Sequence, residues 1–129
     1  IIQFKIGQES YKVDGIFKKM DTKAMIVESR TMLPIRFLAE SIGARINWTP
    51  ATQIINLYLG LIEIEMQVNN PQATVNGKKV MIDSNNPLVK PIVVPPGRTL
   101  LPLRFVAENL RCKVDWNAAK QEVTVTYLN

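Results

Sequence analysis

Apolar and polar residues alternate in two short stretches, as expected of strands that have one face against a core. Residues 44–48 alternate apolar and polar, and residues 112–116 repeat that order. Successive side chains of a strand point to opposite faces. Both stretches are therefore predicted to be half-buried strands with Trp48 and Trp116 on the core side. Further strands are predicted after the following polar turns, at residues 55–59 and 123–127.

A helical pattern precedes each of these strands. Apolar residues recur three and four positions apart and would share one helix face; they are Ile35, Leu38 and Ile42, and then Leu103, Val106 and Leu110. Pro34 and Pro102 stand where each helix begins, because the first helical position does not need the N–H that proline lacks. A helix of about ten residues is predicted after each proline. Gly43 can end the first helix in a left-handed conformation, which Arg111 would adopt at some cost in the second.

Turn signals predict the elements ahead of the helices. Asn76-Gly77 separates two strand-like runs and predicts a hairpin, because both turn residues need positive φ. Shorter third strands are predicted at 25–27 and 92–94. Residues 61–68 alternate as a strand. That strand has no visible counterpart before Ile1, which would make the chain a fragment that lacks one strand.

The chain repeats itself. Shifted by 68 positions, residues 30–40 match residues 98–108 with eight of eleven identities. The same shift pairs the two tryptophans, and a two-residue slip aligns Ile6-Gly7 with Asn76-Gly77. The predicted fold is α+β, with two tandem βββαββ repeats over residues 1–60 and 61–129.

The run Leu-Pro-Ile/Leu-Arg-Phe-x-Ala-Glu, with tryptophan eight residues later, resembles the copper amine oxidase N-terminal domain-like family in two tandem copies. The resemblance implies a five-stranded antiparallel sheet twisted around one helix per module. It also implies a non-catalytic stalk, remote from any copper or quinone centre, in bacterial cell-surface or secreted proteins. The residues expected to form its structural signature are Arg30, Pro34, Arg36, Phe37, Glu40, Trp48, Arg98, Pro102, Arg104, Phe105, Glu108 and Trp116.

Composition argues against catalysis. The chain has no histidine, the commonest near-neutral acid/base and transition-metal ligand, and Cys112 is its one cysteine. Met20, Met25 and Met32 lie within thirteen residues and, with Cys112, could offer soft ligands for Cu(I), but their spacing favours packing. We therefore expect no enzyme activity, catalytic residue, metal or cofactor.

Charge narrows the possible partners only a little. Sixteen Lys and Arg against eleven Asp and Glu leave a net charge of +5. The basic doublets at 18–19 and 78–79 are not equivalent in the two copies, so no nucleic-acid site is predicted. Glu63 and Glu65 interrupt the longest apolar stretch, so membrane insertion is not expected. Oligomeric state is left open.

Some surface features leave two functions open. Arg36 with Glu40, and Arg104 with Glu108, are one helical turn apart, and their repetition predicts partial burial or backbone contacts rather than surface bridges. Aromatic residues expected to be more exposed are Tyr11, Phe17, Tyr58 and Tyr127. The preferred function is an extracytoplasmic spacer or interaction module. The alternative is a module that binds cell-wall glycan or polysaccharide. The expected partners are cell-wall glycan or another surface protein, and no ligand-binding residue is assigned.

Overall fold

The computed structural model describes residues 1–95 and 97–127. Its elements, in chain order, are β1 (Ile2–Lys5), β2 (Ser10–Val13), β3 (Ile16–Lys19), β4 (Met25–Val27), β5 (Arg30–Leu33), α1 (Arg36–Ser41), β6 (Arg45–Thr49), β7 (Ile54–Leu59), β8 (Ile62–Gln67), β9 (Gln72–Val75), β10 (Lys78–Met81), β11 (Ile92–Val94), β12 (Arg98–Pro102), α2 (Leu103–Asn109), β13 (Cys112–Asn117) and β14 (Glu122–Tyr127). The fold is α+β, as predicted, with mostly antiparallel strands and two short helices.

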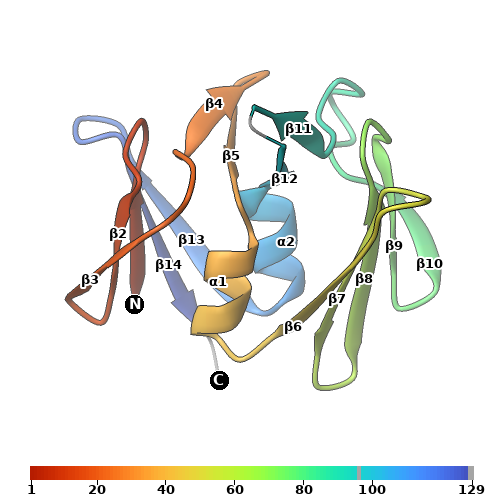
Figure 1. Cartoon of the computed structure of the whole chain (residues 1–129), viewed down its shortest axis with the longest axis horizontal. Coiled ribbons are helices and arrows are strands. Elements are labelled where there is room, and N and C mark those ends of the chain that lie inside the picture. The colour runs from red at the N-terminus through yellow and green to blue at the C-terminus, as the bar shows by residue number, and fades with distance from the viewer. Residues whose placement is uncertain (96, 128–129) are drawn as a thin grey trace.

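The strands form three antiparallel sheets (Figure 1). The first sheet has the order β13-β14-β1-β2-β3, the second β10-β9-β8-β7-β6, and a small central sheet β11-β12-β5-β4. The two five-stranded sheets stand on either side of the molecule, and both helices lie between them next to the central sheet. This arrangement gives the helices apolar neighbours on several sides.

Each five-stranded sheet combines strands from both halves of the chain. In the first sheet, β1 pairs with β14 in a register that places Ile2 opposite Val125. In the second sheet, β6 and β7 of the N-terminal half continue into β8, β9 and β10 of the C-terminal half. The predicted boundary between residues 60 and 61 therefore falls in the turn between two paired strands.

The predicted βββαββ order has too few strands, because five strands precede the helix in each half of the chain. The structure adds β5 and β12 directly before the helices, and these two strands pair with each other, Leu101 opposite Leu33. Met32 and Leu33 are both buried, so the alternation that marks a half-buried strand is absent there. The predicted third strands are confirmed as β4 and β11.

Strand β8 does have a counterpart, which is β1, so the sequence alignment of the hairpins was wrong. The turn equivalent to Asn76-Gly77 is Asp14-Gly15, and both turns have φ near 50° and then 82°. These turns are 62 positions apart, not 70. Backbone bonds repeat at that spacing: the N–H of Ile6 donates to the carbonyl of Gln121 at 2.9 Å, and the N–H of Val68 to that of Gln53 at 3.1 Å. A longer loop between β10 and β11 hid the match.

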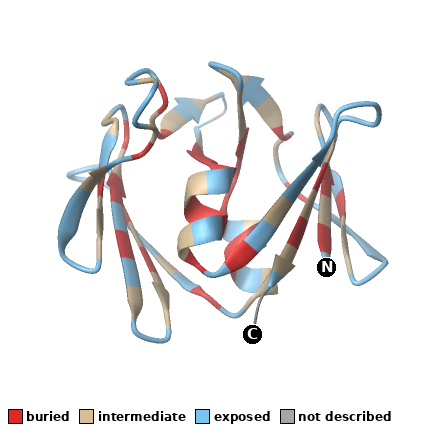
Figure 2. Cartoon of the chain, turned by 180° about the vertical axis from the view of Figure 1, so that it is seen from behind, coloured by how far each residue is buried: buried red, intermediate tan, exposed pale blue. Residues whose placement is uncertain are grey.

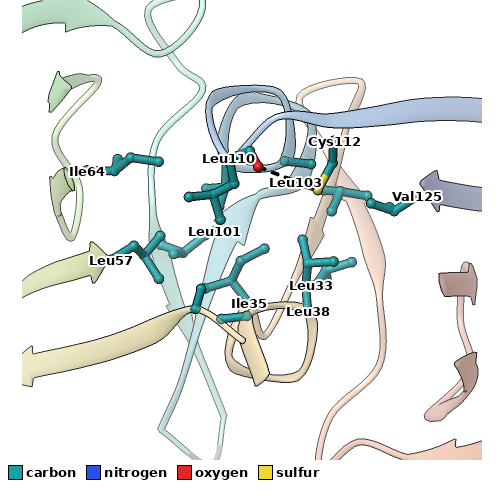
Figure 3. Packing of buried hydrophobic residues seen from close by; sticks show 14 of the residues in the cluster. Leu33, Ile35, Leu38, Leu57, Ile64, Leu101, Leu103, Leu110, Cys112 and Val125 are labelled. Atoms are coloured by element: carbon teal, nitrogen blue, oxygen red, sulfur yellow. Dashed lines mark hydrogen bonds between the residues drawn. The ribbon is translucent and has the colours of Figure 1, made fainter. Parts of the chain in front are cut away.

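One apolar core joins the sheets and helices (Figures 2 and 3). Leu57 and Ile64 of the second sheet lie on one side of it, and Val125 of the first sheet on the other, with leucines of the helices and central sheet between them. The buried residues of the described chain face the interior between the sheets (Figure 2), and none of them is charged; Tyr11 and Cys112 are the buried residues with a titratable side chain. The core therefore holds the frame together mainly by apolar packing.

The helices are shorter than the ten residues predicted. After α1 and α2 the chain takes left-handed conformations, with φ 79° at Gly43 and 65° at Arg111. The conformation expected of Arg111 is thus confirmed. The apolar faces are also confirmed, since Leu38 and Val106 are fully buried. Neither described helix is long and apolar enough to span a membrane.

Candidate functional site

The two tryptophans are half-exposed, so their predicted burial is wrong. Trp48 is 41% exposed and Trp116 is 42% exposed. The alternation placed them on the correct face, but burial declines along each strand, from Cys112 at 5% to Trp116. Strands β6 and β13 are the edges of their sheets, and the tryptophans lie toward the ends that lead away from the helices. The sequence pattern gives the face of a residue but not where the core stops.

Each tryptophan lines an open groove. The larger, the Trp116 groove, has a volume of about 720 Å³. The smaller, the Trp48 groove, has about 400 Å³. Residues that line the Trp116 groove and have an equivalent in the other at the 68-residue shift are Pro102, Leu103, Arg104, Phe105, Val114, Trp116 and Val123; the equivalents in the Trp48 groove are Pro34, Ile35, Arg36, Phe37, Ile46, Trp48 and Ile55.

The opposite half of the chain completes each groove. Arg30 of the N-terminal half lines the Trp116 groove beside Asp83, and Arg98 of the C-terminal half lines the Trp48 groove beside Asp21. Both grooves therefore exist only where the two halves meet.

Two reciprocal ion pairs fix these arginines. The Nε of Arg30 donates to the Oδ2 of Asp83 at 2.6 Å. The Nε of Arg98 lies 2.8 Å from the Oδ2 of Asp21. Asp21 and Asp83 are 62 positions apart, the spacing that relates β3 to β10. Sequence comparison missed both aspartates because it used shifts of 68 and 70; the spacing between the Asp14-Gly15 and Asn76-Gly77 turns would have found them.

Asp83 is held as a carboxylate. The backbone N–H of Asn85 donates to its Oδ1 at 2.9 Å, and this bond is the largest cause that lowers the pKa of Asp83 below its ordinary value. Desolvation raises the pKa of Asp83, and the Arg30 guanidinium lowers it again through its hydrogen bond and its charge. The side chain of Asp83 is 13% exposed. The pair therefore presents a donor and an acceptor side by side at the groove wall.

The helical ion pairs are surface bridges, so the predicted partial burial is wrong. Arg36 lies 3.6 Å from Glu40, and Arg104 lies 3.2 Å from Glu108. All four side chains are more than half exposed. Arg36 also reaches Asp21 at 3.6 Å, so the Trp48 groove contains a small charge network.

The predicted signature residues gather at these grooves. Arg30, Pro102, Arg104, Phe105, Glu108 and Trp116 line one groove, and Pro34, Arg36, Phe37, Trp48 and Arg98 line the other. Glu40 does not line a groove and reaches the Trp48 groove only through Arg36. Residues that recur in both halves thus converge on two equivalent surface sites.

The other aromatic side chains do not line these two grooves, although Tyr11 packs against the groove residue Phe37. Phe17 is 70% exposed and Tyr127 39%, as expected. Tyr11 is only 6% exposed, so its predicted exposure is wrong. It stacks on Phe4 with ring centroids 5.2 Å apart and meets Phe37 edge-on at 5.9 Å. Tyr58 is half-buried and lies beneath the guanidinium of Arg45.

The side chains present do not fit a copper site. The sequence contains no histidine, and Met20, Met32 and Cys112 are buried in the core. Burial raises the pKa of the Cys112 thiol, which disfavours the thiolate that would bind a metal. Across residues 1–95 and 97–127, no group of three or more Cys, Asp or Glu side chains is placed to hold a metal ion.

Comparison with known proteins gives one family. A search among curated proteins and another among solved structures each found no significant match. The model of the copper amine oxidase N-terminal domain matches residues 12–125, which include all of both grooves. The chain therefore belongs to the copper amine oxidase N-terminal domain family.

Proposed function

We propose that this chain is a non-catalytic spacer and interaction module of a bacterial cell-surface or secreted protein, located outside the cytoplasm. The domain that gives the family its name is a non-catalytic, stalk-like part of copper amine oxidases. The observation that carries the proposal is the exchange of strands between the halves, which builds one rigid frame. The repeated sequence supports describing that frame as two copies of one unit.

Strand exchange supports rigidity because separating the halves would break both large sheets. Separation would break two strand ladders, β1–β14 and β7–β8. It would also break the two ion pairs between the halves, Arg30–Asp83 and Arg98–Asp21. Hinge motion requires an interface that slides or opens at low cost, and shared sheets lack one. A module of this kind holds whatever it carries at a fixed distance and orientation.

The positions of the chain ends favour an interaction role beside the spacer role. Ile2 lies opposite Val125 in the β1–β14 ladder, so the two ends of the described chain are neighbours (Figure 1). Segments attached at both ends would leave from the same side. The module would then stand to one side of the attached segments, and a partner could reach its two grooves.

Rigidity is testable by measuring a distance distribution between spin labels. Labels at Lys18 of β3 and Lys79 of β10, both exposed, would report on the two outer sheets in a Cys112→Ala background. A single narrow distribution is expected. A broad or two-peaked distribution would contradict a rigid frame. Labels at Lys18 and Lys113, both exposed and on the outer strands β3 and β13 of the first sheet, give the width expected within one rigid sheet.

Location is testable on cells that express the complete parent protein. Antibody raised against this chain should label intact cells or appear in the culture medium. Labelling only after the cells are broken open would contradict an extracytoplasmic position.

The second candidate is binding of glycan or polysaccharide. It is favoured by one observation, the two half-exposed tryptophans in equivalent grooves.

A further inference from the structure

The two tryptophans are half-exposed although their strands alternate in a way that points them toward the core. An indole ring contributes most to stability when it is buried. Yet both halves leave the ring half-exposed, at 41% and 42%, at the same point of an edge strand. Phe37 and Phe105, which pack against the core, line the same grooves. Each groove therefore offers a flat aromatic surface, and this exposed surface occurs in both halves of the chain.

The charged side chains that line each groove belong to ion pairs. In the Trp48 groove, Asp21 contacts both Arg36 and Arg98, and Glu40 beside the groove pairs with Arg36. In the Trp116 groove, the positive charges of Arg30 and Arg104 face the negative charges of Asp83 and Glu108, so the formal charges cancel. An anionic ligand would have to displace a carboxylate to reach either guanidinium. A neutral ligand faces no such competition.

A guanidinium paired with a carboxylate can form hydrogen bonds of both directions with the hydroxyl groups of a ligand. A hydroxyl donates one hydrogen bond and accepts others, whereas a guanidinium only donates and a carboxylate only accepts. Adjacent hydroxyls can therefore bridge Arg30 and Asp83 without breaking their bond. A pyranose ring combines such hydroxyls at its edge with an apolar C–H face that fits an indole. The volumes of about 720 and 400 Å³ are in the range of small-molecule sites.

We propose that the two grooves are equivalent subsites for pyranose units of an uncharged polysaccharide. Trp48 and Trp116 stack on the sugar rings. Arg98 with Asp21, and Arg30 with Asp83, hydrogen-bond the hydroxyls. The inference goes beyond the spacer role and does not depend on it. Two like sites favour a polymer, because its repeated units occupy the second site at a high effective concentration.

Tryptophan fluorescence, excited selectively over tyrosine, reports on these sites alone, because Trp48 and Trp116 are the protein's only tryptophans. Hydroxyethyl cellulose, mannan and glycogen serve as uncharged probes, and polygalacturonate as an anionic one. Titration at 0.5 M NaCl should change the emission with at least one uncharged polymer and protect the indoles from acrylamide quenching. Trp48→Phe and Trp116→Phe each leave one reporter, and both reporters should respond to the same polymer.

Affinity electrophoresis in gels that contain the responding polymer gives the second measurement. Trp48→Ala or Trp116→Ala should weaken retardation about tenfold or more, and the double variant should migrate as in a gel without polymer. Phe17→Ala removes an aromatic ring that is 70% exposed outside the grooves, and should bind as the wild type does. Circular dichroism confirms that each variant is folded.

Several results would overturn the proposal. One is the absence of any fluorescence change or protection with every uncharged polymer; this readout uses the unmodified chain and does not depend on variants that fold. Another is binding to polygalacturonate alone that disappears at 0.5 M NaCl, because net charge would then explain it. A third is undiminished binding by the double tryptophan variant. Each of these results would leave the rigidity test of the spacer role unaffected.

Discussion

At the scale of single residues, the chain accepts local strain at turns that the fold requires. Eight non-glycine residues have positive φ, among residues 1–95 and 97–127. Two of them, Glu28 at 52° and Ser29 at 61°, form the turn between β4 and β5 without a glycine. This turn was not predicted because it lacks the Asn-Gly or Asp-Gly signal. A glycine in the sequence can mark a turn with positive φ, but a turn in which other residues adopt positive φ has no such mark.

Arg111 provides a test of that strain. Its φ of 65° matches the 79° of Gly43, the glycine at the equivalent position. A left-handed residue with a side chain costs about 1 kcal/mol, partly offset by the greater chain entropy that glycine loses on folding. Arg111→Gly should raise the free energy of unfolding by up to about 1 kcal/mol in denaturant melts. Gly43→Ala is the reverse control and should lower it by about as much; a loss of stability in Arg111→Gly would contradict the account.

Asp83 provides a pH test. Its pKa is lowered in the folded state, so the carboxylate contributes stability above the ordinary aspartate pKa of about 3.9, and this contribution is lost as pH falls through the lower folded value. Asp83→Asn should therefore be less stable than the wild type at pH 7, and the two unfolding free energies should converge in acid. Asp115→Asn, in an exposed contact with Lys113, is the control and should follow the wild type throughout. A difference for Asp83→Asn that stays constant down to pH 2 would exclude its ionisation as the cause.

At the scale of elements, periodicity found the helices and most strands but not their partners. The apolar faces of α1 and α2 and the strands β6, β7, β13 and β14 follow from residue spacing, because their apolar residues recur at helical or alternating positions. Strands β5 and β12 could not be found that way, since consecutive residues such as Leu100 and Leu101 are both buried. The exposure of Trp116 also could not be found, because it depends on where neighbouring strands and helices end. The ion-pair partners of Arg30 and Arg98 could not be predicted either, because they depend on how strands distant in the sequence pair.

Strand β1 is the element that sequence alignment misplaced, and its central side chain tests it. Phe4 is fully buried between the strands β14 and β2 and stacks on Tyr11. Phe4→Ala should cost about 3 to 5 kcal/mol of unfolding free energy, as expected for a large buried aromatic side chain. Ile16→Ala, on the outer strand β3 and 66% exposed, should change it by less than about 0.5 kcal/mol. Equal, small effects of both substitutions would show that β1 is not part of the sheet.

At the scale of the whole molecule, the two halves of the chain are not separate modules joined by a linker. Each large sheet takes strands from both halves, each groove takes residues from both halves, and each of the two cross-half ion pairs has an equivalent in the other groove. The sequence revealed that a unit recurs but not that the copies exchange strands, because the same residues would satisfy their hydrogen bonds in either arrangement. Both candidate functions follow from the exchange, since it supplies the rigid frame and it builds the grooves.

The most direct test separates the halves into fragments of residues 1–60 and 61–129. Each fragment contains one tryptophan, so fluorescence and circular dichroism follow both. Because neither fragment contains all five strands of either large sheet as the whole chain pairs them, each should be largely unfolded as a monomer, and mixing them in equal amounts should restore the spectrum and the melting transition of the whole chain. Native-like, monomeric folding of either fragment by itself would contradict strand exchange as the basis of the fold.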